Sequence, residues 1–188
     1  LELDHVSLFV GTAVVALTAL LVLCSPATRQ ALRHTVLSVF FLLVALFTLS
    51  AANVLVFYVA WELTALFAWG LGHLADDAEE GVVPFSAAGA LASLLMFAGL
   101  LVLVAGSRTA SLAGLKVAES GLVGLMILVA VFLKVFGLLS EGWRRSGSGR
   151  FSLANASLAG ASLLVVGFYP VLRLFGPAAA GSPAALPL

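Results

Sequence analysis

Long apolar runs separated by short polar breaks dominate the chain. Each run is close to the ~20 residues that a helix needs to cross the hydrocarbon core of a bilayer. No alternation of apolar and polar positions over about 10 residues, which would indicate a transmembrane barrel, is found. The pattern therefore predicts an all-α integral membrane protein with six transmembrane helices. The six runs are His5–Leu23, Thr35–Ala52, Asn53–Leu71, Pro84–Ala105, Ser120–Ser140 and Phe151–Phe175.

The polar breaks are short and rich in residues that favour bends, such as Ser25-Pro26, Gly106-Ser107 and the Ser-Gly repeat at 146–149. Because short connections keep consecutive helices together, we expect a single transmembrane domain over residues 1–176. Residues 177–188 are rich in Pro, Ala and Gly and are predicted to form a C-terminal tail.

Composition supports a membrane location, since 62% of the residues are hydrophobic and only 10% are charged. The formal net charge is zero and no basic stripe with interleaved aromatic residues occurs, which argues against nucleic-acid binding. The single cysteine, Cys24, cannot form an intrachain disulfide, and no Cys/His cluster has metal-ligand spacing. Without an iron–sulfur motif, a nucleotide-binding loop or a nucleophile with its base, we expect no cofactor and no catalysis by this chain alone.

The distribution of basic residues predicts an orientation. By the positive-inside rule, the loops that carry more Lys and Arg face the cytoplasm. This rule places the N-terminus and the C-terminal tail outside. The cytoplasmic loops would contain Arg29, Arg33, Arg144, Arg145 and Arg150, and the opposite side Arg108, Lys116 and Arg173.

Two residues of opposite charge lie inside the apolar runs. Glu62 directly follows Trp61 in the third run, and Lys134 lies in the fifth. A charged group at the bilayer centre costs roughly 2.5 to 3.5 kcal/mol even on the lenient insertion scale. Proximity would favour the charged forms of both groups, whereas separation would favour the neutral forms. We therefore expect the two helices to lie side by side with Glu62 facing Lys134, and the pair to form part of a proton path.

Two motifs resemble one family of membrane proteins. Residues 57–63, Phe-Tyr-Val-Ala-Trp-Glu-Leu, resemble the fifth helix of the antiporter-like proton-pumping subunits of respiratory complex I, Mrp-type cation/proton antiporters and membrane-bound hydrogenases. Residues 132–135, followed by Trp143, resemble the seventh helix, in which an embedded Lys precedes a Trp by nine positions. Shorter similarities occur in the third helix, in the loop between the sixth and seventh helices, and in the eighth helix. They lie at 3–7, 106–115, 158–160 and 167–169, together with Arg173.

The resemblance covers nearly the whole chain, as helices three to eight of a family whose members usually have about fourteen. It implies that the last five helices form one half of the family's inverted-repeat core. It also implies a subunit of a redox-driven proton-translocating complex, similar to complex I (NADH dehydrogenase) or to a hydrogenase, whose other membrane-arm subunits are its partners. Such a complex would lie in the cytoplasmic membrane of a prokaryote or an equivalent energy-transducing membrane. Glu62 and Lys134 would then form a proton half-channel, with Ser162, Asn155 and Glu141 as further candidates for the path.

Three positions depart from the family pattern. Phe136 replaces the Pro that usually follows the Lys by two residues, Glu141 stands at the His position, and Val165 stands where helix eight usually offers a Lys or His. The relay thus lacks its next titratable residue. Two alternatives stay open: a structural scaffold subunit in which the ion pair is static, and a small cation/proton transporter that dimerises to rebuild the core. Small-residue spacings such as Gly89 with Ser93 indicate close contacts between helices.

Overall fold

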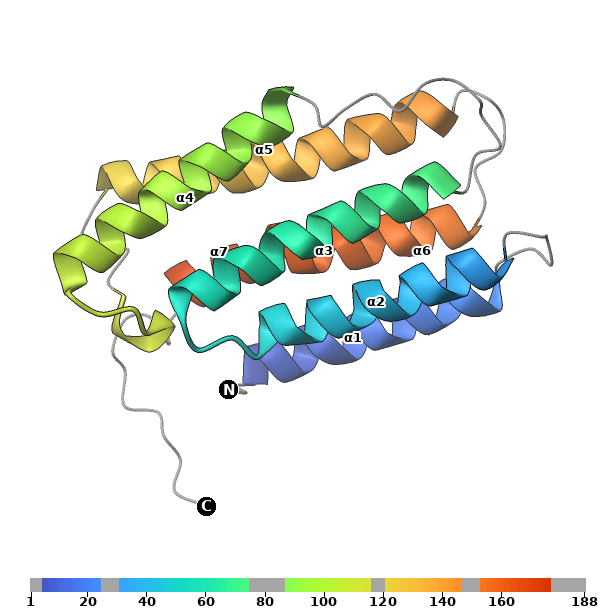
Figure 1. Ribbon diagram of the computed structural model, residues 1–188, viewed down its shortest axis with the longest axis horizontal. Helices are drawn as coiled ribbons and strands as arrows, with labels where there is room; N and C mark the ends of the chain where they lie inside the picture. The colour runs from blue at the N-terminus through green and yellow to red at the C-terminus, as the bar shows by residue number, and fades with distance from the viewer. Residues whose placement is uncertain (1–4, 25–30, 75–86, 116–120, 147–152, 177–188) are drawn as a thin grey trace, which may run out of the picture.

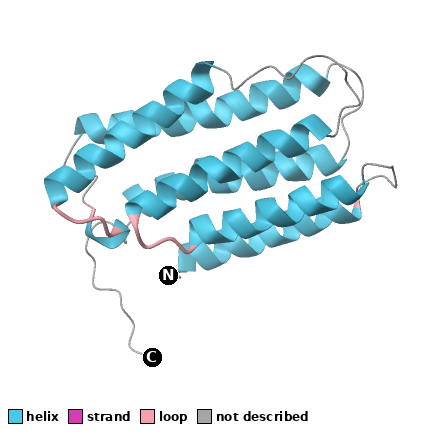
Figure 2. Cartoon of the chain, in the orientation of Figure 1, coloured by secondary structure: helices cyan, strands magenta, loops and turns pink. Residues whose placement is uncertain are grey.

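The computed structural model describes residues 5–24, 31–74, 87–115, 121–146 and 153–176, and these are almost entirely helical (Figures 1 and 2). The predicted tail at 177–188 lies outside the described residues. The last membrane-length segment consists of two α-helices joined by a π-helical turn, Leu163–Phe168. The three elements follow one another directly and form one continuous helical segment. The α-helices are α1 (His5–Leu23), α2 (Ala31–Leu49), α3 (Val54–Leu74), α4 (Ala87–Ser107), α5 (Gly121–Ser146), α6 (Leu153–Ser162) and α7 (Tyr169–Phe175).

Six helical segments are long and apolar enough to cross a membrane: α1 to α5 and the continuous segment from α6 to α7. The prediction of an all-α protein with six membrane-length helices is therefore confirmed. The largest single difference is at the end of α5, which reaches Ser146 rather than Ser140, and α2 begins four residues before Thr35 and ends at Leu49. Residues 51–53 are extended because they pair with another connector, described below.

The helices form two groups (Figure 1). α1, α2, α3 and the α6–α7 segment pack together, whereas α4 and α5 pack chiefly against each other. The close approach of α4 to α5 depends on Gly99, because a Cβ atom built there would lie 2.9 Å from Cγ1 of Ile127. α3 and α5, which we expected to lie side by side, make only a small contact. The α4–α5 hairpin contacts the other helices chiefly through α5, which packs closely on the π-helical turn at Gly167.

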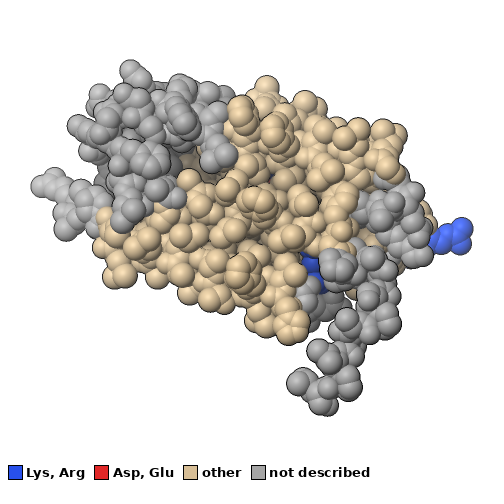
Figure 3. All heavy atoms as spheres, turned by 180° about the vertical axis from the view of Figure 1, so that it is seen from behind, with Lys and Arg blue, Asp and Glu red and all other residues tan. Residues whose placement is uncertain are grey.

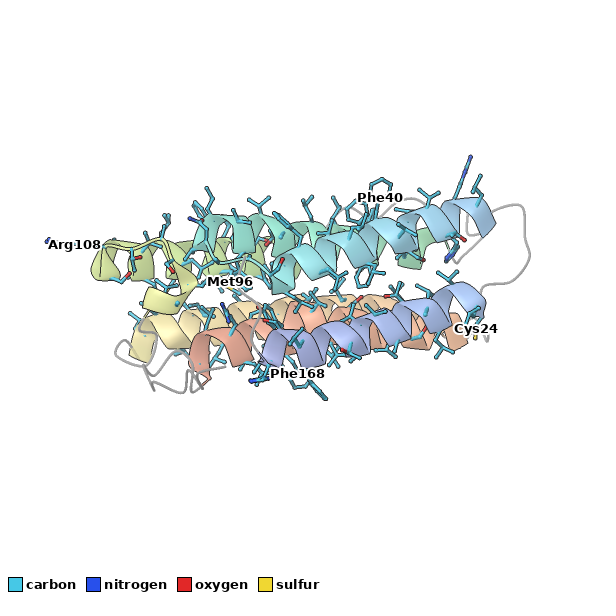
Figure 4. The ribbon with its side chains drawn as sticks, turned by 90° about the horizontal axis from the view of Figure 1, so that it is seen from below. Cys24, Phe40, Met96, Arg108 and Phe168 are labelled. Carbon is cyan, nitrogen blue, oxygen red and sulfur yellow. The ribbon has the colours of Figure 1, made fainter. Side chains whose placement is uncertain are left out.

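Side-chain burial separates an interior from a lipid-compatible exterior. Phe57, Trp61 and Tyr169 are fully buried, whereas Phe40 and Phe168 are about half exposed and point away from the bundle (Figure 4). One whole face of the described surface is nearly free of charged side chains (Figure 3). Large exposed apolar side chains suit contact with lipid rather than with water.

A short antiparallel contact joins the connector after α2 to the connector after α4. The N–H of Val54 donates to the carbonyl of Ala110 at 2.9 Å, and the N–H of Leu112 donates to the carbonyl of Ala52 at 2.8 Å. Asn53 Oδ1 accepts the Leu55 N–H at 2.8 Å and so caps the first turn of α3. Both connectors therefore lie at the same end of the bundle, which fixes where the α4–α5 hairpin is attached.

Candidate functional site

Glu62 and Lys134 form an ion pair inside the bundle. Lys134 Nζ lies 2.5 Å from Glu62 Oε2, and the Lys134 side chain is only 3% exposed, against 22% for Glu62. Glu62 lies about 12 Å from the start of α3 at ~1.5 Å rise per residue, well within a membrane-spanning segment. The structure thus brings together the two embedded charges identified in the sequence. The side chain of Glu62 is thus the more exposed of the two, although its Oε1 atom is buried.

Ser93 of α4 is the third member of the site, and it was not identified from the sequence as a site residue. Lys134 Nζ donates to Ser93 Oγ at 2.7 Å, and Ser93 Oγ lies 3.0 Å from Glu62 Oε2 and 3.0 Å from the Gly89 carbonyl. The single hydroxyl hydrogen can serve either the carboxylate or the carbonyl. The sequence feature that could have identified Ser93 is its hydroxyl group in the interior of an otherwise apolar helix. Its spacing from Gly89 had indicated only close helix packing.

Trp61 covers the other side of the lysine. Its ring centroid lies 4.9 Å from Lys134 Nζ, within the range of a cation–π interaction. Its indole N–H donates to the carbonyl of Val166, in the π-helical turn, at 2.8 Å. The ammonium group is therefore held between a carboxylate and a hydroxyl on one side and an aromatic face on the other.

The two carboxylate oxygens of Glu62 have different environments. Oε2 contacts both Lys134 and Ser93, whereas Oε1 is buried and has no hydrogen-bond partner. Nearby, the Tyr58 hydroxyl donates to the Ser93 carbonyl at 3.3 Å, which ties α3 to α4 beside the site. Oε1 is thus the atom at which Glu62 can accept a proton without giving up its contact to the lysine.

The remaining sequence candidates lie apart from this cluster or outside the described side chains. Ser162 is buried and donates to the Leu158 carbonyl of its own helix at 2.9 Å. The side chains of Glu141, near the end of α5, and Asn155, in the first turn of α6, are not among those described. α5 runs unbroken through Phe136, and Val165 is fully buried in the π-helical turn. Neither position supplies a titratable group.

A second buried polar cluster, here called the tyrosine clamp, consists of Tyr169, Ser7 and the Leu49 carbonyl. Tyr169 Oη donates to the Leu49 carbonyl at 2.6 Å and lies 3.1 Å from Ser7 Oγ. Since the tyrosine hydrogen is directed to Leu49, the serine acts as the donor to the tyrosine. The clamp joins α1, α2 and α7 with neutral groups only.

Metal binding finds no support in the described residues, where no group of three or more His, Cys, Asp or Glu side chains is placed to hold an ion. Comparison with known proteins yields no match: no protein-family model, no curated protein and no solved structure is similar to the chain. The site is therefore interpreted from its own geometry, and the resemblance to antiporter-like subunits stays a hypothesis.

Proposed function

We propose that the chain is a membrane-arm subunit of a redox-driven proton-translocating complex, similar to complex I or to a membrane-bound hydrogenase. It would contribute a proton half-channel built on Glu62, Lys134 and Ser93. The observation that carries this proposal is the ion pair itself, a 2.5 Å contact between two titratable groups inside apolar helices. Ionisable residues at such a depth are rare and usually belong to ion or proton pathways.

The proposed proton transfer follows from the coupling between the two charges. A proton arriving on Oε1 neutralises Glu62, and the Lys134 ammonium then lacks its balancing charge in a low-dielectric site. Lys134 is thereby biased to release one proton from Nζ. The proton on Glu62 then passes to the neutral amine of Lys134, which restores the carboxylate and the ammonium. One proton enters the site and one leaves in each cycle.

The driving energy would come from partner subunits, because the proposed chemistry in this chain is restricted to proton binding and release. The greater exposure of Glu62, 22% against 3% for Lys134, supports coupling from the carboxylate side of the pair. A neighbouring subunit that changes the charge or hydration beside Glu62 would change the protonation of Lys134 through the pair. The similarity of the Trp61-Glu62 and Lys134 motifs to antiporter-like subunits supports the same class of complex.

A structural scaffold is the second candidate function, and two observations favour it. α5 continues without a break past Lys134, and the fully buried Val165 stands where the family usually has a Lys or His. A static ion pair would then fix the α4–α5 hairpin against α3 without moving protons. The two functions predict different results for a variant that loses the charges and keeps the packing. Proton transport should fall if the pair is a half-channel and should stay the same if the pair is a scaffold.

Lys134→Met tests the proposal in the assembled complex reconstituted into vesicles. The substitution keeps an unbranched apolar stem, and Glu62 can avoid the cost of an unpaired charge by binding a proton. We expect the subunit to stay bound while the number of protons translocated per electron falls. Leu133→Met, which introduces the same side chain at the neighbouring position, is the matched control and should leave that ratio unchanged.

An unchanged proton-to-electron ratio in Lys134→Met, with the subunit still bound, would contradict the half-channel and support the scaffold. If the subunit is lost from the complex, Glu62→Gln is measured instead, because it keeps the shape of the carboxylate side chain. The ratio should fall in that variant as well.

A further inference from the structure

Trp61 contacts both the ion pair and the π-helical turn. It is fully buried, its ring faces Lys134 Nζ at 4.9 Å, and its indole N–H bonds to the Val166 carbonyl at 2.8 Å. A buried indole N–H needs an acceptor, and most carbonyls inside a regular helix already accept a backbone N–H. Val166 lies in the π-helical turn, Leu163–Phe168, and the residue four positions after it is Pro170, which has no N–H. The Val166 carbonyl therefore lacks its usual α-helical donor and accepts from Trp61 of α3.

The same turn also contacts the helix that carries the lysine. A Cβ atom built on Gly167 would lie 2.6 Å from Cγ2 of Val135, the residue that follows Lys134. Only glycine allows this approach without a shift of the neighbouring helix. The turn therefore touches α3 through Val166 and α5 through Gly167, on either side of the lysine.

We propose that Trp61 is a positioning residue for Lys134. Its aromatic face holds the ammonium group against Glu62 and Ser93, and its indole hydrogen bond to Val166 fixes the orientation of the ring. The inference deepens the proposed function, on which its role in transport rests. The predicted effect of Trp61 on the ion pair can be measured without transport.

The aromatic face stabilises the ammonium, and a charged lysine stabilises the ionised form of Glu62. Removal of the face therefore weakens the charged pair and favours a proton on Glu62. A cation–π interaction in a desolvated site corresponds to roughly a fivefold to thirtyfold change in such an equilibrium. The protonated fraction of Glu62 thus reports on the ring directly.

The experiment measures the infrared carbonyl band of protonated Glu62 in the purified full chain, in lipid nanodiscs at one fixed pH. Loss of the band in Glu62→Gln assigns it. We expect Trp61→Leu to raise the ratio of protonated to ionised Glu62 by about fivefold or more. Trp61→Phe, which keeps an aromatic face but lacks the N–H donor, should give a smaller rise. Trp69→Leu, on the same helix, should leave the band unchanged.

Fluorinated tryptophan keeps the test valid if Trp61→Leu does not fold. In a chain whose Trp69 and Trp143 are replaced by Phe, indoles with one to four fluorine atoms weaken the negative ring face and change its shape little. The ratio of protonated to ionised Glu62 should rise stepwise with the number of fluorine atoms.

A ratio that does not change with fluorination would overturn the positioning role of Trp61. Such a result would leave the half-channel untouched, because that proposal depends on the proton-to-electron ratio in Lys134→Met. Conversely, a stepwise rise in the ratio together with unchanged transport in Lys134→Met would establish Trp61 as the positioning residue of a static ion pair.

Discussion

The protein contains two buried polar junctions that connect helices in different ways. The tyrosine clamp is neutral, and its tyrosine hydroxyl both donates to the Leu49 carbonyl and contacts Ser7. The site of Glu62, Lys134 and Ser93 is charged, and one carboxylate oxygen, Oε1, is buried without a partner. Satisfied neutral hydrogen bonds hold helices together, whereas an incompletely satisfied charged group is costly and usually functional.

The two junctions also join different helices. The clamp joins α1, α2 and α7, whereas the charged site joins α3 to the α4–α5 hairpin. We therefore expect removal of the clamp to affect stability alone, whereas removal of a charge should affect both stability and the proposed proton transfer.

The largest effect should come from Glu62→Leu, which removes the acceptor and leaves Lys134 buried without its partner. Breaking a buried pair from one side costs about 3 kcal/mol or more. We expect this loss in the free energy of unfolding of the purified chain, together with loss of proton transport in the assembled complex. A loss below about 1 kcal/mol would mean that Lys134 escapes this cost by becoming neutral in the variant.

Tyr169→Phe removes the hydroxyl group of the tyrosine clamp and tests whether the clamp affects stability alone. The change leaves the Leu49 carbonyl and the Ser7 hydroxyl without the tyrosine oxygen, and hydrogen bonds between membrane helices contribute about 1 kcal/mol. We expect unfolding in mixed micelles to shift by this amount while the proton-to-electron ratio stays the same. Phe168→Leu, at a neighbouring lipid-facing position, serves as the control. Loss of transport in a folded Tyr169→Phe protein would show that the clamp also belongs to the path.

Ser93→Ala should affect function more than stability. The pair keeps its direct contact, so the free energy of unfolding should fall by about 0.6 kcal/mol. Lys134 loses the Ser93 hydroxyl as an acceptor, and we expect the transport rate to fall severalfold. Ser93→Thr restores a hydroxyl and should recover part of the rate. Ser107→Ala, whose hydroxyl bonds at 2.7 Å to the Leu103 carbonyl of its own helix, should behave as the unmodified protein does.

The last and smallest change, the introduction of single cysteines, tests the orientation of the chain in the membrane. With Cys24 replaced by Ser, single cysteines at positions 108 and 145 should react with a membrane-impermeant reagent from opposite sides, with position 145 on the cytoplasmic side. Arg108 is exposed at the end of the bundle that holds the paired connectors (Figure 4). Labelling of position 108 from the cytoplasm would reverse the predicted topology.

Hydropathy predicted the positions of the helices because run length alone determines whether a segment spans the bilayer. It also identified Glu62 and Lys134, since charges stand out in apolar runs. Packing partners could not be predicted in this way. Lipid-facing and buried side chains are equally apolar, so the pattern does not reveal which face of α5 meets α4. Ser93 and the π-helical turn were missed for related reasons, because a lone serine and a change in backbone register leave little trace in hydropathy.

The most direct test of the central claim is the proton-to-electron ratio of the double variant Glu62→Gln and Lys134→Met, measured in the reconstituted complex. The double variant removes both charges and keeps side chains of similar size, so a static junction should tolerate it. Our account predicts that the subunit stays bound and that the ratio falls as far as in Lys134→Met alone. A ratio equal to that of the unmodified complex would show that the pair only holds the helices together.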